Sequence, residues 1–152
     1  MEIYANPRAW RVRIAQAAIW GFGALIIWLA FFSNGPVGSM GEQIFVWVVG
    51  ALMALVMAGT EYYLRAYVVD MRLEGGLRIT TLSFFGQRSI TVDPALVRVG
   101  AEKHDFFVAR QVVNNFWAPM HVPGEPLPLI VDTTAASLDM AALERAAARR
   151  RK

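Results

Sequence analysis

Residues 14–32 read IAQAAIWGFGALIIWLAFF, and residues 44–60 read IFVWVVGALMALVMAGT before the chain continues through Glu61 to Leu64. As a helix the first stretch is about 28 Å long, close to the thickness of the hydrocarbon core of a bilayer. The chain has 15 Lys and Arg residues, and none of them lies within residues 14–64. A soluble helical protein needs charges on its outer faces, whereas a bilayer-embedded segment avoids them. The sequence therefore predicts transmembrane helices at 14–32 and 44–64, joined by a loop at 33–43.

The distribution of charge predicts the orientation of this hairpin. The loop contains Glu42 but no cation, whereas arginines lie on both outer flanks of the hairpin. The positive-inside rule then places both termini in the cytoplasm and the loop in the periplasm of a bacterial inner membrane, with residues 1–13 as a basic N-terminal segment. A cleaved signal peptide is the alternative, but the first apolar run is longer than a signal peptide needs and no A-x-A motif follows it. The flanking arginines are Arg8, Arg11, Arg13, Arg65, Arg72 and Arg78.

Small residues recur at four-residue spacing within both apolar stretches. They are Ala17 and Gly21 in the first, and Gly50, Ala54 and Ala58 in the second. Small side chains let helix backbones approach closely, so we expect these residues to form the seam of the hairpin. The alternative is that Ala and Gly are simply common in transmembrane helices.

Composition argues against most classes of enzyme and cofactor protein. The chain has no Cys, which excludes disulfides, thiolate nucleophiles and Cys-based metal sites. Its two histidines, His104 and His121, lack partners at ligand spacing, and no glycine-rich phosphate loop or serine-hydrolase motif is present. The pI near 9.7 comes without the basic and aromatic pattern of nucleic-acid binding. We therefore expect no catalytic, cofactor or metal site and no nucleic-acid partner.

After the second apolar stretch the sequence changes to short alternating segments. Residues 66–74 alternate apolar and polar side chains, as a strand does, and Gly75-Gly76 can turn the chain into LRITTLSFF at 77–85. Further short strands are expected in RSITV, ALVRV, FFVARQVV and LPLIVD. An Ala-rich amphipathic helix at 138–150, with Ser137 as its expected N-cap, then closes the chain. Six or seven antiparallel strands followed by one helix predict a small, mostly β cytoplasmic domain over residues 65–152.

The sequence YVVDMRLEGGLRITTLSFFGQRSITVDPALVRV, placed directly after a helical hairpin, resembles bacterial two-span membrane proteins with a pleckstrin-homology-like (PH-like) domain. It is also similar to the two-span assembly factors of mitochondrial respiratory complexes. The resemblance rests on the hairpin, on ITTLSFFG and on PLPLIVD before a terminal helix, and covers most of the chain. It implies a barrel plugged by its C-terminal helix. The chain lacks a mitochondrial targeting extension, which points to a bacterial protein.

Two further segments are expected to make contacts. Residues 114–128, NNFWAPMHVPGEPLP, contain four prolines and are predicted to form an irregular loop. Phe116, Trp117 and Met120 within this loop would contact a partner or the membrane surface, or fold back onto the barrel. The basic tail Arg149, Arg150, Arg151 and Lys152 would either bind anionic lipid headgroups or be a solvated helix end.

These features favour a non-enzymatic accessory protein, an assembly factor or stabilising subunit, of a larger energy-transducing inner-membrane complex in respiration or photosynthesis. The hairpin would dock by its small-residue faces, and the domain would contact the partner through strand edges and the proline-rich segment. The rival hypothesis is a membrane-anchored lipid- or ligand-binding module. It requires a concave basic site, for which Arg72, Arg78, Arg88 and Arg110 are the candidates.

Overall fold

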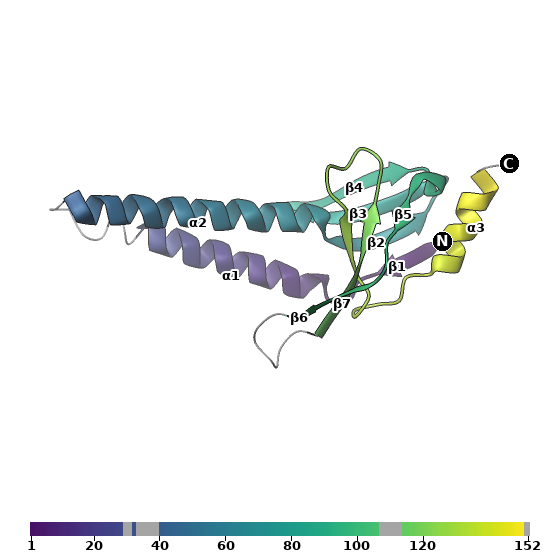
Figure 1. Cartoon of the computed structure of the whole chain (residues 1–152), viewed down its shortest axis with the longest axis horizontal. Coiled ribbons are helices and arrows are strands. Elements are labelled where there is room, and N and C mark those ends of the chain that lie inside the picture. Colours follow the sequence, from purple (N-terminus) through teal and green to yellow (C-terminus); the bar gives the residue numbers. More distant parts are fainter. Residues whose placement is uncertain (29–31, 33–39, 107–113, 151–152) are drawn as a thin grey trace. The chain divides into compact units, whose positions relative to one another are not determined.

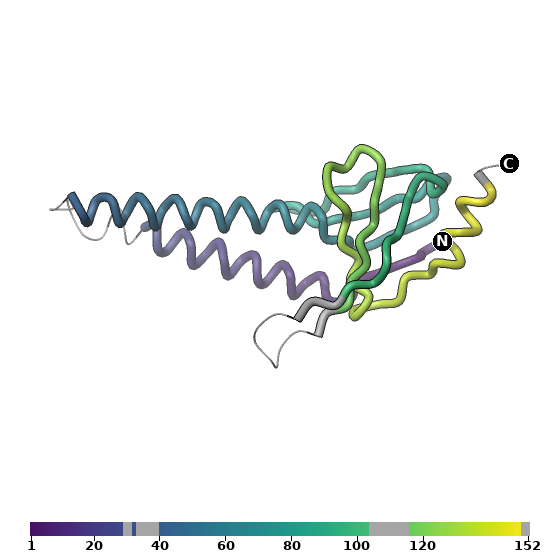
Figure 2. The backbone as a smooth tube through the Cα atoms, in the orientation of Figure 1, coloured from purple at the N-terminus to yellow at the C-terminus, as the bar shows by residue number. Residues whose placement is uncertain are grey.

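The computed structural model describes residues 1–28, 32, 40–106 and 114–150 (Figures 1 and 2). The chain divides into two compact units. The first, the sheet domain, combines Met1–Ala9 with Leu64–Lys152, and the second, the helix pair, is Trp10–Tyr63. The elements are β1 (Glu2–Ala5), α1 (Ala9–Trp28), α2 (Met40–Ala66), β2 (Val68–Leu73), β3 (Leu77–Ser83), β4 (Gly86–Val92), the 3₁₀ helix η2 (Pro94–Leu96), β5 (Arg98–Val99), β6 (Lys103–Phe106), β7 (Asn114–His121), β8 (Leu129–Asp132) and α3 (Met140–Arg150).

Both apolar stretches form helices, and they differ in how well they qualify as membrane spans. Among the described residues, α2 alone is long and apolar enough to cross a bilayer. α1 begins at Ala9, ahead of the predicted span at 14–32, and takes in Arg11 and Arg13; the last part of that predicted span includes residues 29–31, outside the described residues. Most of the predicted loop, residues 33–39, also lies outside them.

The first sheet is antiparallel in the order β1-β2-β3-β4. Its strands β2, β3 and β4 follow the predicted alternation, but β1 lies within residues 1–13, which were predicted to be only a basic N-terminal segment. Glu2 pairs with Arg72 and Tyr4 with Met71, and the shift of register between these pairs is a bulge. A bulge inserts an extra residue, so Ile3 and Tyr4 can both be buried although they are adjacent. The N-terminus is therefore an edge strand of the sheet domain.

The second sheet contains β5, β6 and β8, all paired antiparallel with β7. The prediction of an irregular loop from residue 114 is wrong, because β7 runs from Asn114 through Pro119 to His121. Proline lacks the N–H that a ladder requires, and the neighbouring strand is interrupted opposite it, between β5 and β6. Gly100, in that interruption, donates its N–H to the Pro119 carbonyl at 2.7 Å. A Cβ at Gly100 would come within 2.8 Å of the Pro119 ring, so glycine suits this crossing.

The two sheets share one hydrophobic core with α3. Met71 and Ile79 contribute from the first sheet, Met120 and Val131 from the second, and Leu143 from α3. An isolated parallel bridge between Tyr67 and Ile130 links the sheets. Over the residues described, the strands form two small sheets and not a closed barrel.

The predicted C-terminal helix is confirmed, with a different cap. α3 begins at Met140, and the carboxylate of Asp139 accepts a hydrogen bond from the Ala142 N–H at 2.8 Å. Asp139, and not Ser137, therefore caps the helix. The Asp139 N–H also donates to the Ile3 carbonyl at 3.2 Å, which ties the start of α3 to β1.

Candidate functional site at the helix roots

Four buried polar residues meet in the sheet domain where the chain leaves for α1 and returns from α2. We call Tyr4, Asn6, Tyr67 and Asp132 the root cluster. The Asn6 Nδ2 donates to the Tyr67 hydroxyl at 2.9 Å, and that hydroxyl donates to Asp132 Oδ2 at 3.0 Å. The Tyr4 hydroxyl donates to the backbone carbonyl of Asp132 at 2.9 Å. One side chain thus comes from β1, two from the segments adjoining the helices, and one from the end of β8.

Asn6 connects the sheet to α1 through its backbone and its side chain. Its N–H donates to the Val69 carbonyl at 2.8 Å, which extends the pairing of β1 with the β2 segment. Its Oδ1 accepts a hydrogen bond from the Arg8 N–H at 2.8 Å, an Asx-type turn directly before α1 begins at Ala9. Since Tyr67 directly follows α2, the Asn6–Tyr67 bond joins the start of one helix to the end of the other.

The electrostatics of the root cluster favour fixed geometry over reactivity. Burial raises the pKa of Tyr4 well above its ordinary value, and the negative charge of Asp132 raises it further. Both carboxylate oxygens of Asp132 accept hydrogen bonds, because Oδ1 receives the Ala135 N–H at 3.0 Å. A buried polar group is stable when its partners satisfy it, and a satisfied network specifies one arrangement. The root cluster is therefore suited to fixing the positions of the helix ends.

The described residues hold no group of three or more His, Cys, Asp or Glu side chains that could bind a metal ion. One hollow of about 460 Å³ lies at the opposite end of the first sheet from the root of α2, beside the β2–β3 turn and α3. Arg145 and Arg149 line it together with apolar residues that include Leu73 and Pro94. This hollow therefore combines two cationic side chains with apolar walls.

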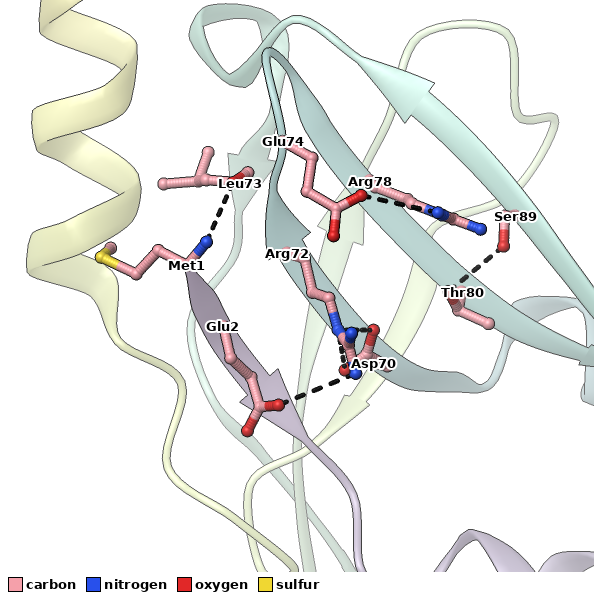
Figure 3. Close-up of polar contacts among 9 residues, drawn as sticks. All are labelled: Met1, Glu2, Asp70, Arg72, Leu73, Glu74, Arg78, Thr80 and Ser89. Carbon is pink, nitrogen blue, oxygen red and sulfur yellow. Dashed lines mark hydrogen bonds and ion pairs between the residues drawn. The ribbon is translucent and has the colours of Figure 1, made fainter.

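The arginines proposed for a concave basic site are each engaged in an ion pair where the structure describes them. Figure 3 shows Arg72 beside Asp70, at 3.0 Å, and Glu2, at 3.9 Å, and Arg78 beside Glu74, at 3.5 Å. The hydrogen bond and charge of Asp70 raise the pKa of the Arg72 guanidinium. Acidic neighbours thus offset the positive charge on this exposed face of the sheet.

The remaining two arginines of that set are Arg88 and Arg110. Arg88 makes two hydrogen bonds to Glu125, the shorter at 2.6 Å, and so ties β4 to the β7–β8 loop. Arg110 lies outside the described residues.

The three predicted contact residues lie in different environments. Phe116 is 39% exposed, whereas Met120 is fully buried in the core of the sheet domain. Trp117 is half-buried, and the Lys103 ammonium lies 5.2 Å from its ring centroid in a cation–π contact. Phe116 and Trp117 thus lie at least partly at the surface, whereas Met120 contributes to the core.

The helix pair makes contact at a position outside the small-residue stripe. A Cβ at Gly23 would lie 3.3 Å from the Met57 sulfur and 3.5 Å from the Met53 sulfur. By contrast, a Cβ at Gly21 would meet nothing within 4 Å. Of the other stripe residues, Ala17, Ala54 and Ala58 are exposed and Gly50 is half-buried.

The basic tail is partly described. Arg149 lines the hollow beside α3, and α3 ends at Arg150, whose side chain is outside the description. Arg151 and Lys152 lie outside the described residues.

The root cluster escaped the sequence analysis because its members come from four separate segments. The one local signal was Asn6-Pro7 before an apolar helix, a typical turn at the start of a helix. The apolar pair Phe84-Phe85 was treated as the end of a strand, but Phe85 is 94% exposed in the β3–β4 turn. No protein-family model matches the chain, and no curated protein matches it either.

Proposed function

We propose that this chain is a non-enzymatic accessory protein, an assembly factor or stabilising subunit, of a larger energy-transducing complex in a bacterial inner membrane. In this proposal α1 and α2 cross the bilayer as a hairpin, and the sheet domain and both termini lie in the cytoplasm. The proposal also takes the sheet domain to be PH-like; the packing of α3, through Ala142 and Leu143, on the core shared by the two sheets supports this. The observation that carries the proposal is the root cluster, which fixes both helix ends to one folded domain.

Two features support a double crossing. α2 has 27 residues, or roughly 40 Å of helix, and apolar side chains cover its surface. Phe45, Trp47 and Leu55 are each more than two-thirds exposed, which favours lipid or a partner helix around them. The pairing of β1 with β2 also holds residues just before α1 beside residues just after α2, an arrangement that is compatible with an even number of crossings.

An accessible strand edge supports the accessory role. In the described part of the first sheet, β4 pairs with β3 along one edge and has no strand along the other. Gln87, Arg88 and Ser89 are exposed there, next to the loop that Glu125 holds in place. A partner segment can add to such an edge through main-chain hydrogen bonds. Phe116 and Trp117 offer a second, aromatic contact.

Gentle purification tests the accessory role. We expect the tagged full chain, extracted in mild detergent, to bring down subunits of an energy-transducing complex identifiable by mass spectrometry. Ser89→Pro, on the exposed β4, should reduce recovery of the partner, whereas Glu74→Gln, at the far β2–β3 turn, should not. Recovery of the chain alone, at native expression and with cross-linking before extraction, would refute the proposal.

The hollow beside α3 supports a second candidate function, a membrane-anchored module that senses a ligand. Arg145 and Arg149 are one helical turn apart and both line the hollow. Because the hollow is at the end of the sheet away from the root of α2, a soluble anion suits it better than the surface of the membrane that holds the chain. Calorimetry with inorganic phosphate and small carboxylic acids tests this candidate. Unchanged binding in Arg145→Glu would rule it out.

A further inference from the structure

The β3–β4 turn exposes the most accessible large hydrophobic side chain among the described residues of the sheet domain. Phe85 is 94% exposed, and its ring lies 4.1 Å from the ring of Phe84, centroid to centroid, at an interplanar angle of 87°. The two rings therefore pack edge to face. They belong to the two turn residues of the β3–β4 hairpin, whose last strand pair is Ser83 with Gly86. Phe85 therefore contributes little to the core and, next to the ring of Phe84, presents apolar surface at this turn.

Strand direction places this turn at the end of the sheet where α2 enters. β2 begins directly after α2 and runs away from it, so the antiparallel β3 runs back toward α2. The Leu82 N–H donates to the Tyr67 carbonyl at 3.3 Å, which sets the base of the turn beside the root of α2. Phe85 lies in the turn itself, two residues after β3 ends at Ser83 and beyond the Leu82–Gln87 pair. Within the sheet domain, the turn is therefore at the same end of the first sheet as Leu64–Ala66, the last residues of α2.

The neighbouring loop adds apolar surface at the same end. Arg88, just after the turn, binds Glu125 through two hydrogen bonds and so holds the β7–β8 loop beside β4. Leu127 in that loop is 39% exposed. Phenylalanine and leucine side chains of surface-bound proteins enter the boundary between headgroups and acyl chains. This insertion is favourable because it removes their apolar surface from water.

We propose that the Phe84-Phe85 turn inserts into the cytoplasmic headgroup region of the bilayer that α2 crosses. This inference rests on the proposed membrane crossing. It adds a second point of attachment, so that the sheet domain lies against the membrane instead of tumbling at the end of α2. The occupant of this surface is lipid, which the chain meets wherever α2 is inserted.

Site-directed spin labelling of the full chain in lipid nanodiscs tests the inference. The absence of native cysteine allows single labels through Gln87→Cys beside the turn, Glu74→Cys at the opposite turn and Leu52→Cys within α2. We expect the label at 87 to be several-fold more accessible to oxygen than to a water-soluble nickel chelate, and the label at 74 to show the reverse. Adding Phe85→Ser to the Gln87→Cys chain should return that label to water.

The three labels separate the possible failures. If the labels at 87 and 74 are equally accessible to nickel while the label at 52 is protected, the turn does not insert and only this inference is overturned. If the label at 52 is also accessible, α2 does not cross, and the proposed function fails with it. If Phe85→Ser leaves a lipid-protected label at 87 unchanged, insertion does not depend on the aromatic turn and the inference is again overturned.

Discussion

Replacing Tyr67 by Phe removes a single hydroxyl from the centre of the root cluster and leaves its packing intact. Tyr67 is 3% exposed, and its hydroxyl bonds both Asn6 and Asp132, at 2.9 and 3.0 Å. A hydrogen bond to a charged group contributes roughly 1.5–3 kcal/mol, and a neutral one roughly 0.5–1.5 kcal/mol. Both partners would remain buried without that hydroxyl. We therefore expect the free energy of unfolding of the sheet domain to fall by roughly 2–4 kcal/mol.

Tyr62→Phe is the matched control, since it makes the same chemical change at a side chain that is 55% exposed. Surface substitutions usually change stability by less than about 0.5 kcal/mol. The assay is urea unfolding of the full chain in mild detergent, followed by hydrogen exchange and mass spectrometry of peptides from β1 and β8. Exchange in these peptides should accelerate in Tyr67→Phe at urea concentrations where the control is still protected.

A double-mutant cycle with Asn6→Ala tests whether the cluster acts as a unit. Groups within one hydrogen-bond network couple by roughly 0.5–3 kcal/mol, so the double variant should be less destabilised than the sum of the single variants. Strict additivity, or a loss in Tyr67→Phe no greater than in the control, would refute the view that these side chains hold the helix ends together.

Three further predictions follow from single contacts. Gly100→Ala forces a Cβ to within 2.8 Å of a proline ring and should cost roughly 1–3 kcal/mol by urea unfolding, whereas Gly86→Ala, with no atom within 4 Å of its added Cβ, should change little. Gly23→Ile sets a branched side chain against two methionine sulfurs of α2 and should lower the thermal midpoint of the helix pair in detergent; Gly21→Ile has open space and should not. Burial raises the pKa of Tyr4 in the folded protein, so above about pH 10, the pKa of tyrosine in unfolded chains, unfolding allows Tyr4 to lose its proton. The contribution of neutral Tyr4 to the free energy of unfolding is therefore fully present below that pH and is lost as the pH rises above it. Urea midpoints between pH 8 and 11.5 should therefore fall less steeply in Tyr4→Phe, and equal slopes would contradict the assignment.

The predictable parts of the fold are those encoded by local pattern. Continuous apolar runs predicted both helices. The alternation of apolar and polar residues predicted β2, β3 and β4, because each strand exposes one face. The terminal helix followed from its alanine content and amphipathic spacing. These features depend on residues within a few positions of one another, so they can be read without knowing the tertiary structure.

The parts that were missed depend on distant partners. β1 has four residues, and its bulge buries Ile3 beside Tyr4, which breaks the alternation that would have identified a strand. β7 contains Pro119, which is tolerated because the opposing strand is interrupted at Gly100. Neither compensation is visible from the segment itself.

The candidate sites also divide into features that local pattern predicts and features that depend on distant residues. The small-residue stripe followed a four-residue spacing, but the contact at Gly23 uses Met53 and Met57, flexible side chains that fit around a missing Cβ. The basic-site hypothesis counted charge without its partners: Glu2, Asp70 and Glu74 lie beside Arg72 and Arg78 in the structure. Ion pairing between strands requires the register, which the sequence does not provide.

The pairing of β1 with β2 has a consequence for how the protein is made. β1 leaves the ribosome before either helix, yet its partner is synthesised only after both, so the first sheet cannot be completed during early translation. If only one helix entered the membrane, β1 would be stranded on the far side and β2 would keep an open edge, which invites aggregation. In the proposed topology, β1 can pair with β2 only after both helices have been inserted. The cytoplasmic domain therefore completes its folding only in chains whose hairpin is fully inserted.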